Sequence, residues 1–311
     1  MTQIEIWAVR DPQEAAQIAL ASELGYFKDE GVDVTIKWIV SGTDMQSLAA
    51  SGQVKAYGES AVVAALLKDK GVDMHYVMRT ADISGNQGFI IGPNTQLSSP
   101  KDLEGKKVGM AAGSGVQLAI ANMAKQYGVD YNKIVFVNLQ PPDQAPALAK
   151  GDIDAMAVWQ PYLLAGEKLG GKLYFTGNRS YIEGQEKPVN WLYLDSGLNV
   201  AGDFLQKNPN TVKALMRALL RATDYINANP REKVAEVLSK PLEVDKGDLA
   251  EIMKGNIYSA DIDQHAVNGT AEFLNFLLQQ KFLSKSMDPK DIYDLRLLKE
   301  IAPEHVKVAG Y

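Results

Sequence analysis

The chain of 311 residues contains no cysteine. That absence excludes disulfide bonds, thiolate metal sites and cysteine nucleophiles. The sequence also lacks any apolar run close to the roughly 20 residues that span a bilayer. Its formal net charge is −6, and Lys and Arg form no basic cluster. We therefore expect no nucleic-acid partner.

Histidines and enzyme motifs are equally scarce. His75, His265 and His305 lie far apart in the sequence, and none belongs to a zinc-ligand or catalytic-triad pattern. We interpret them as structural or solvated residues and expect neither a metal nor a cofactor. The sequence has no G-x-S-x-G elbow, no H-E-x-x-H and no redox motif, which favours a binding protein over an enzyme.

Alternating strand and helix patterns fill the first two thirds of the chain. Strand patterns at 4–9, 32–40, 54–58 and 74–81 alternate with helix patterns at 12–27, 41–52 and 60–71. This order predicts a parallel sheet with helices on its faces. The rhythm restarts after residue 88, and helical patterns dominate from about residue 196, beginning with 200–207.

Two α/β units followed by a helical return predict an α/β fold with two lobes. We place the first lobe at residues 1–85 and 192–311, the second at 86–191, and a hinge near 82–88 and 186–196. The aromatic segment 189–195 is expected to be a strand that returns to the first lobe. Ligands of open α/β sheets bind beyond the carboxyl ends of the strands, so the expected site is a cleft between the lobes.

Polar and glycine-rich segments follow the predicted strands. In the first lobe these are 10–13, 41–44 and 58–60, and in the second 111–117, 138–144 and 158–162. The segment "AAGSGVQ" (111–117) opens a helix, and its backbone N–H groups and helix dipole suit an anion. The alternative is an ordinary helix N-cap at Ser114. Trp159 and Trp191 are candidates either for a ligand wall or for core packing.

Glu59 poses a separate question, because it lies between a strand and a helix start. A carboxylate there interacts favourably with the helix dipole, by about 0.3–1 kcal/mol. If it faces the cleft, its desolvation requires a partner such as Arg10, or a cationic group on the ligand. We favour the ligand-binding interpretation of Glu59.

The motifs together resemble one family of transport proteins. "VNLQPPDQAPALAKGDIDAMAVWQPY", with "SGTDMQSLAASGQV" and "NPNTVKALMRALL" in the same order, is similar to solute-binding proteins of ABC importers. The similarity covers nearly the whole chain and is greatest to the taurine-binding branch of the taurine, alkanesulfonate and nitrate group.

The resemblance implies a type II periplasmic-binding-protein fold (a Venus flytrap) that delivers a small solute to a membrane permease. It also implies a monomer located in the periplasm or elsewhere outside the cytoplasm, with the native leader absent from this chain. The residues that it places at the ligand, together with Glu59, are Arg10, Asp11, Ser41, Gly42, Thr43, Ser60, Ser114, Gly115, Val116, Asp143, Trp159, Gln160 and Trp191.

The chain also departs from its relatives. It has Gly58-Glu59-Ser60 where taurine-binding relatives carry two small hydroxyl residues, and it has fewer hydroxyl groups near Ser114. The ligand is therefore expected to be sulfonate-like, zwitterionic or amine-bearing. One alternative is a binder of a thiamine-pyrimidine precursor or an aromatic acid. A second is an enzyme of the pyrimidine-synthase or menaquinone-pathway type, which the lack of cysteine disfavours.

Overall fold

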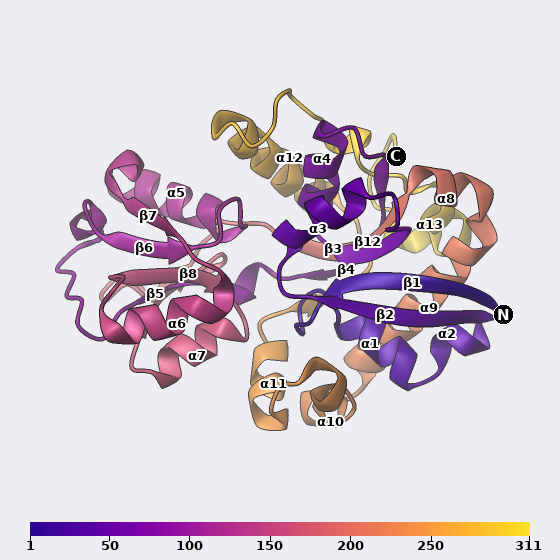
Figure 1. The fold of residues 1–311 in the computed structure, drawn as a ribbon, viewed down its shortest axis with the longest axis horizontal. Helices are drawn as coiled ribbons and strands as arrows, with labels where there is room; N and C mark the ends of the chain where they lie inside the picture. Colours follow the sequence, from indigo (N-terminus) through magenta and orange to yellow (C-terminus); the bar gives the residue numbers. More distant parts are fainter. The chain divides into compact units, whose positions relative to one another are not determined.

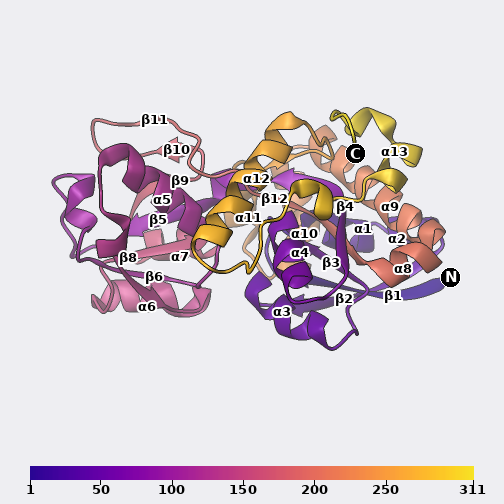
Figure 2. The same cartoon turned by 90° about the horizontal axis from the view of Figure 1, so that it is seen from above.

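A computed structural model describes residues 1–311, with the exception of the side chains of Thr43, Gln46 and Ala50. Contacts within the chain divide it into two compact units. Unit 1 comprises Met1–Asp82 and Leu194–Tyr311, and unit 2 comprises Ile83–Tyr193. Both chain termini belong to unit 1 (Figure 2).

Unit 1 contains a mixed sheet of strands in the order β13-β4-β12-β3-β1-β2. The strands span Thr2–Val9 (β1), Val32–Ile39 (β2), Ala56–Glu59 (β3), Met74–Asp82 (β4), Asp195–Ala201 (β12) and Ile257–Tyr258 (β13). β1 pairs in parallel with β2 and β3, and β12 lies antiparallel between β3 and β4. The parallel sheet predicted for this unit is therefore interrupted by a strand from the far end of the chain.

Helices cover both faces of this sheet, as Figure 1 shows, with α1 and α2 on one face and α3 and α4 on the other. The first four helices span Ala16–Glu23 (α1), Tyr26–Asp29 (α2), Gly42–Ala50 (α3) and Ala61–Asp69 (α4). The later ones span Gly202–Lys207 (α8), Pro209–Ala228 (α9), Arg231–Leu242 (α10), Lys246–Met253 (α11), Gln264–Gln279 (α12) and Arg296–Ile301 (α13). Short 3₁₀ turns lie at Pro289–Asp291 and Pro303–His305.

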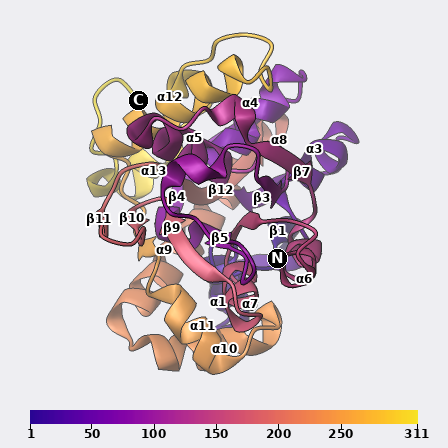
Figure 3. The same ribbon diagram turned by 90° about the vertical axis from the view of Figure 1, so that its left-hand side faces the viewer.

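Unit 2 contains a second mixed sheet, in the order β11-β10-β9-β5-β8-β6-β7. Its strands span Gln87–Ile91 (β5), Lys107–Met110 (β6), Val135–Asn138 (β7), Ala155–Trp159 (β8), Lys172–Thr176 (β9), Arg179–Ser180 (β10) and Lys187–Pro188 (β11). Its helices span Val116–Tyr127 (α5), Pro141–Lys150 (α6) and Tyr162–Lys168 (α7), with 3₁₀ turns at Ser84–Asn86, Pro100–Leu103 and Tyr131–Lys133. Figures 1 and 3 show α5 on one face of the sheet and α6 and α7 on the other.

The hydrophobic pattern of the strands explains which faces are buried. In β1, Ile4, Ile6 and Ala8 are buried while Glu5 is exposed, which is the period-two alternation expected of a strand. β8, by contrast, is buried along its whole length, because helices pack on both of its faces, α5 on one and α6 and α7 on the other.

The helix predicted at 12–27 is wrong in its extent. Residues 12–15 form turns, α1 begins at Ala16, and Gly25, with φ 75°, separates α1 from α2. The helix does not begin at residue 12 because Asp11 Oδ1 accepts the backbone N–H groups of Gln13 and Glu14, at 2.8 Å each. This side-chain cap holds a local turn in place of the first helical turn.

The strand predicted at 189–195 is also wrong. Residues 189–194 are irregular, and the strand β12 begins at Asp195 and continues to Ala201, so that its end overlaps the start of the helix predicted at 200–207. Trp191 and Leu192 donate their backbone N–H groups to the carbonyl of Gly177, at 2.9 and 3.1 Å. The aromatic residues of this segment pack inside unit 2. The strand is formed instead by the following residues, which include Gly197 and have a weaker strand pattern.

Candidate functional site

Glu59 is the last residue of β3, and its carboxylate lies at the start of α4. The side chain is only 8% exposed. Its Oε2 accepts the backbone N–H of Ser60 at 2.5 Å, and the hydroxyl of Ser60 is a further hydrogen-bond partner. Ser60 is the N-cap residue of α4, so the carboxylate lies where the helix dipole favours negative charge.

The second carboxylate oxygen of Glu59 lies against Gly42, the first residue of α3. A Cβ atom on Gly42 would stand 1.9 Å from Glu59 Oε1 and 2.7 Å from the carboxyl carbon. Only glycine leaves room for the carboxylate in this position. Glu59 therefore contacts the beginnings of two helices, α3 and α4, and not the single helix considered from the sequence.

Two serines predicted for the site, Ser41 and Ser60, are buried. Ser60 follows Glu59 in the chain, and Ser41 precedes α3. Ser41 is 1% exposed and its carbonyl accepts the N–H of Asp44, whereas Ser60 is 4% exposed. The side chain of Thr43 lies outside the described residues.

Arg10 and Asp11, at the end of β1, have different environments. Arg10 forms an ion pair with Glu243 and lies 5.2 Å from the ring centre of Trp38. The cation proposed from the sequence as a partner for Glu59 is thus engaged by another carboxylate. Asp11 is 1% exposed, and its carboxylate caps the turn that follows it.

Burial raises the pKa values of the carboxyl groups in this part of unit 1. The pKa of Asp11 rises to about 7, and that of Glu59 also rises to about 7, in each case mainly because the charged form is desolvated. The same cause raises the pKa of Asp195 to about 6. Repulsion between these carboxylates adds to the effect, since Glu59 raises the pKa of Asp11 and Asp195 raises that of Glu59.

Two acidic residues of this region, Glu14 and Asp195, were not predicted from the sequence. Glu14 is 7% exposed, and burial and the carboxylates of Glu59, Asp11 and Asp195 raise its pKa well above the usual value. In the sequence Glu14 lies within an apparent helix, where an acid is unremarkable. Asp195 begins β12, and because that strand was not predicted, nothing in the sequence brought Asp195 to the end of β3.

In unit 2, a tight turn connects β6 to α5. Gly113 has φ 79°, a left-handed conformation that favours glycine, and α5 begins at Val116 with Gly115 as its N-cap residue. The N-cap predicted at Ser114 is therefore wrong by one residue. Ser114 is 7% exposed, and its hydroxyl has no hydrogen-bond partner among the described residues.

Trp159 lies at the same edge of the unit 2 sheet as this turn. β6 and β8 are parallel neighbours, with Met110 paired to Ala157, so both strands end side by side. The indole of Trp159 packs into a core cluster with Val158 and Leu163 and is 9% exposed. Its Nε1 has no hydrogen-bond partner in the part of the chain that the structure describes. Core packing accounts for the indole ring, and the unpartnered Nε1 leaves the alternative of a ligand wall open.

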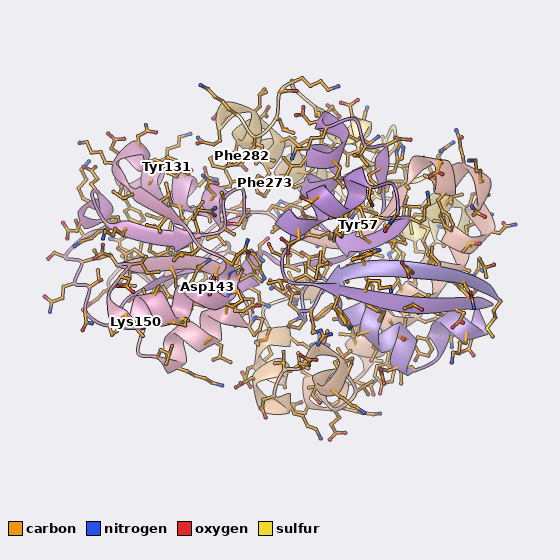
Figure 4. All side chains as sticks on the ribbon, viewed as in Figure 1. Tyr57, Tyr131, Asp143, Lys150, Phe273 and Phe282 are labelled. Atoms are coloured by element: carbon orange, nitrogen blue, oxygen red, sulfur yellow. The ribbon has the colours of Figure 1, made fainter. Side chains whose placement is uncertain are left out.

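Of the remaining candidates of unit 2, Gln160 and Trp191 form hydrogen bonds within the unit, and Asp143 is exposed. Gln160 Oε1 accepts the N–H of Leu164 at 3.1 Å in the first turn of α7. Asp143 is exposed in the first turn of α6, where Figure 4 labels it. Trp191 is 3% exposed, and its Nε1 donates to Gln126 Oε1 at 2.9 Å. Core packing is the role that this geometry gives Trp191.

Among the described residues, no group of three or more His, Cys, Asp or Glu is arranged to hold a metal ion. His75 and His305 each contact one carboxylate, Asp73 at 3.0 Å and Asp261 at 2.7 Å.

Comparison with solved structures identifies the class of fold. The crystal structure of the periplasmic aliphatic sulphonate binding protein SsuA from Escherichia coli superposes with a TM-score of 0.76. The match covers 94% of this chain and 97% of that chain at 16% sequence identity. The α/β architecture is therefore that of the two-lobed type II periplasmic binding proteins, and the fold predicted from the sequence is confirmed.

Sequence comparison then identifies the family. The model of the NMT1/THI5-like family matches residues 13–233, and the chain belongs to that family. The taurine-binding periplasmic protein of Escherichia coli (strain K12) is 27% identical over 281 residues, which cover 86% of this chain and 84% of that protein. A Bacillus subtilis (strain 168) protein named as an aliphatic sulfonates-binding protein is 26% identical over 305 residues, 94% of this chain and 87% of that protein. The predicted resemblance to the taurine and sulfonate group is confirmed.

Proposed function

We propose that this protein is the solute-binding component of an ABC importer. It captures a small polar organic solute outside the cytoplasm and delivers it, as a monomer, to a membrane permease. The family, the fold and the names of the relatives support this function. Within the described residues, none of the helices is both long and apolar enough to cross a membrane.

The observation that carries the proposal is the pair of unused donors in unit 2. Ser114 Oγ and Trp159 Nε1 are both buried and without partners among the described residues, at neighbouring strand ends beside the start of α5. An unsatisfied buried polar group costs about 1–3 kcal/mol. A ligand acceptor, such as a carboxylate or sulfonate oxygen, removes that cost and gains the helix dipole as well.

Unit 1 supplies the second group of proposed contacts, Ser41, Gly42, Thr43, Glu59 and Ser60. These residues surround the carboxylate of Glu59 or lie on the loop before α3. Ser114, Gly115 and Val116 in unit 2 would suit an anionic group of the ligand, and Glu59 in unit 1 would suit a cationic group. A zwitterionic or amine-bearing solute meets both requirements, because its charges are separated.

An enzymatic function has less support than binding. The chain has no cysteine, and its sequence has no G-x-S-x-G elbow and no H-E-x-x-H motif. The two relatives named above are binding proteins by name. We therefore propose that no chemical step occurs at this site.

Thermal-shift screening tests the proposed function. The panel contains taurine, alkanesulfonates, nitrate, polyamines, aromatic carboxylates and pyrimidines, each at millimolar concentration. A true ligand stabilises the folded state by RT ln(1 + [L]/Kd), about 2.7 kcal/mol at a hundredfold excess over Kd. If no member of the panel raises the Tm, the proposal is wrong.

A further inference from the structure

Four carboxyl groups gather at one end of the unit 1 sheet. Asp11 follows β1, Glu59 ends β3, and Asp195 begins β12, which runs antiparallel to β3. Glu14 lies in the turn before α1 and is coupled electrostatically to all three. We call these residues the acidic cluster. Their exposed fractions are between 1% and 8%, so the charges are largely removed from water.

Two members of the acidic cluster are used by the fold itself. Asp11 caps its own turn through the backbone N–H groups of Gln13 and Glu14. Asp195 accepts the hydroxyl of Tyr76 at 3.0 Å and the backbone N–H of Ala61 at 3.4 Å. These bonds explain the presence of two carboxylates without any ligand.

The other two members are not explained in this way. Glu14 contacts the hydroxyl of Ser196, yet its Oε2 is buried without a partner among the described residues. Glu59 has a donor at Oε2, but its Oε1 lies against the backbone of Gly42. Both side chains retain 7–8% exposure, more than Asp11 or Asp195.

An uncharged side chain gives a second, independent indication of a missing donor. Gln17 is 1% exposed, and its Nε2 donates to the carbonyl of Thr80 at 2.7 Å. The hydroxyl of Thr80 bonds Ser196 Oγ at 2.6 Å, and Ser196 in turn contacts Glu14. Gln17 Oε1, like Glu14 Oε2, has no partner in the described part of the chain. Two buried acceptors on one hydrogen-bonded chain therefore lack a donor.

The nearby cations of the protein do not balance this charge. Arg10 is paired with Glu243. Arg79 lowers the pKa of Asp195, but it also donates to the carbonyl of Asp261 at 2.8 Å and faces Asp82. One guanidinium is thus shared by two carboxylates, and no ion pair of Glu14 or Glu59 with Lys or Arg is seen among the described residues.

We infer that the acidic cluster binds a protonated amine of the ligand, with Glu59 and Glu14 as the direct contacts. This inference rests on the proposed function and assigns the substrate class, which is cationic or zwitterionic. An ammonium group supplies donors and a positive charge to Glu14 Oε2, which has no donor among the described residues, and to Glu59, whose donors are the uncharged groups of Ser60. A lone anion is disfavoured in unit 1, because the Glu59 carboxylate already lies at the starts of α3 and α4.

Isothermal titration with matched ligand pairs tests the inference. Each pair differs only in one amine replaced by a hydroxyl: taurine and 2-hydroxyethanesulfonate, β-alanine and 3-hydroxypropanoate, putrescine and 4-aminobutan-1-ol. We expect the member that keeps this amine to bind about thirtyfold more tightly in at least one pair, because a buried charge pair contributes at this level. Equal affinities within every pair that binds would overturn the inference and leave the proposed function intact.

Charge-neutral variants locate the contact. Glu59→Gln and Glu14→Gln should each weaken binding of the amine by about thirtyfold and leave the hydroxyl analogue nearly unchanged. Glu23→Gln is the matched control, because Glu23 is an exposed acid of α1. Unchanged amine affinity in both cluster variants would contradict the inference.

Two further outcomes separate this inference from the proposed function. If only solutes without an amine bind, the acidic cluster does not select the ligand, while the protein remains a solute-binding protein. If neither these pairs nor the wider thermal-shift panel produces binding, the proposed function itself is wrong.

Discussion

At the scale of single residues, the contact between Gly42 and Glu59 is the most sharply constrained feature of unit 1. We predict that Gly42→Ala destabilises the protein by about 1–3 kcal/mol, because the new methyl group would overlap the Glu59 carboxylate. Chemical denaturation measures the change. In a Glu59→Ala background the same substitution should cost much less, and equal costs in both backgrounds would contradict the steric explanation.

Replacing Ser114 should affect the stability of the protein and its affinity for the ligand in different ways. Its hydroxyl is buried without a partner among the described residues, so Ser114→Ala should raise the free energy of unfolding of the ligand-free protein by about 1–3 kcal/mol, the cost of the unsatisfied group. Ligand affinity should fall about tenfold, the value of one hydrogen bond. The Tm and a titration with the solute found by screening are the two measurements. A large loss of stability with unchanged affinity would assign Ser114 to the fold.

At the scale of secondary-structure elements, Trp191 attaches the segment 189–194 to α5. Its Nε1 bonds Gln126, and its ring lies edge-on to Phe175 at 5.2 Å and to Tyr127 at 6.1 Å. We predict a loss of about 1–2 kcal/mol for Trp191→Phe, which keeps an aromatic ring but removes the donor. Urea unfolding measures it. If the hydrogen bond is the cause, Trp191→Phe should lower the free energy of unfolding much less in a Gln126→Ala background.

The elements also show where sequence patterns succeed and where they fail. β1 and β2 have clear alternation, and both were predicted within one or two residues. β12 was missed because its residues Asp195–Ala201 include Gly197 and a buried Asn199, whose amide donates to the carbonyl of Glu59 at 2.7 Å. Such a strand is stabilised by partners on both sides, β3 and β4, and that contribution is not encoded in local alternation.

At the scale of the whole molecule, the acidic cluster gives stability a distinctive pH dependence. The folded state holds the pKa of Asp11 and Glu59 at about 7 and that of Asp195 at about 6, above the unfolded values near 4. Between those limits the folded protein binds more protons than the unfolded chain, so stability falls as pH rises from about 4 through about 7. We predict a lower Tm at pH 8 than at pH 5 for the ligand-free protein.

Other groups contribute to this pH profile, so a variant must isolate the cluster. His75 acts in the opposite direction, because burial lowers its pKa, and Arg79 opposes the shift at Asp195. Glu59→Gln should flatten the decline in Tm between pH 5 and pH 8, whereas Glu23→Gln should not. A wild-type Tm that rises across this range, unaltered by Glu59→Gln, would contradict the prediction.

The sequence by itself determined the fold class, the family resemblance and most of the segments that follow the strands. These properties depend on local patterns: period-two alternation, helix starts, and motifs such as "GDIDAMAVWQPY" that are read directly from neighbouring residues. Gly42, Glu59, Ser60 and Ser114 were all found in this way, because each adjoins a strand end or a helix start.

Only the tertiary structure decided the chemistry around Glu59. Glu14 and Asp195 reach it from an ordinary turn and from a strand far along the chain, and Arg10 is paired with Glu243. Burial, the packing of the carboxylate against Gly42 and the mutual repulsion of the acids arise from contacts between distant segments. Such contacts have no local signature, which is why the sequence located the carboxylate and the fold defined its surroundings.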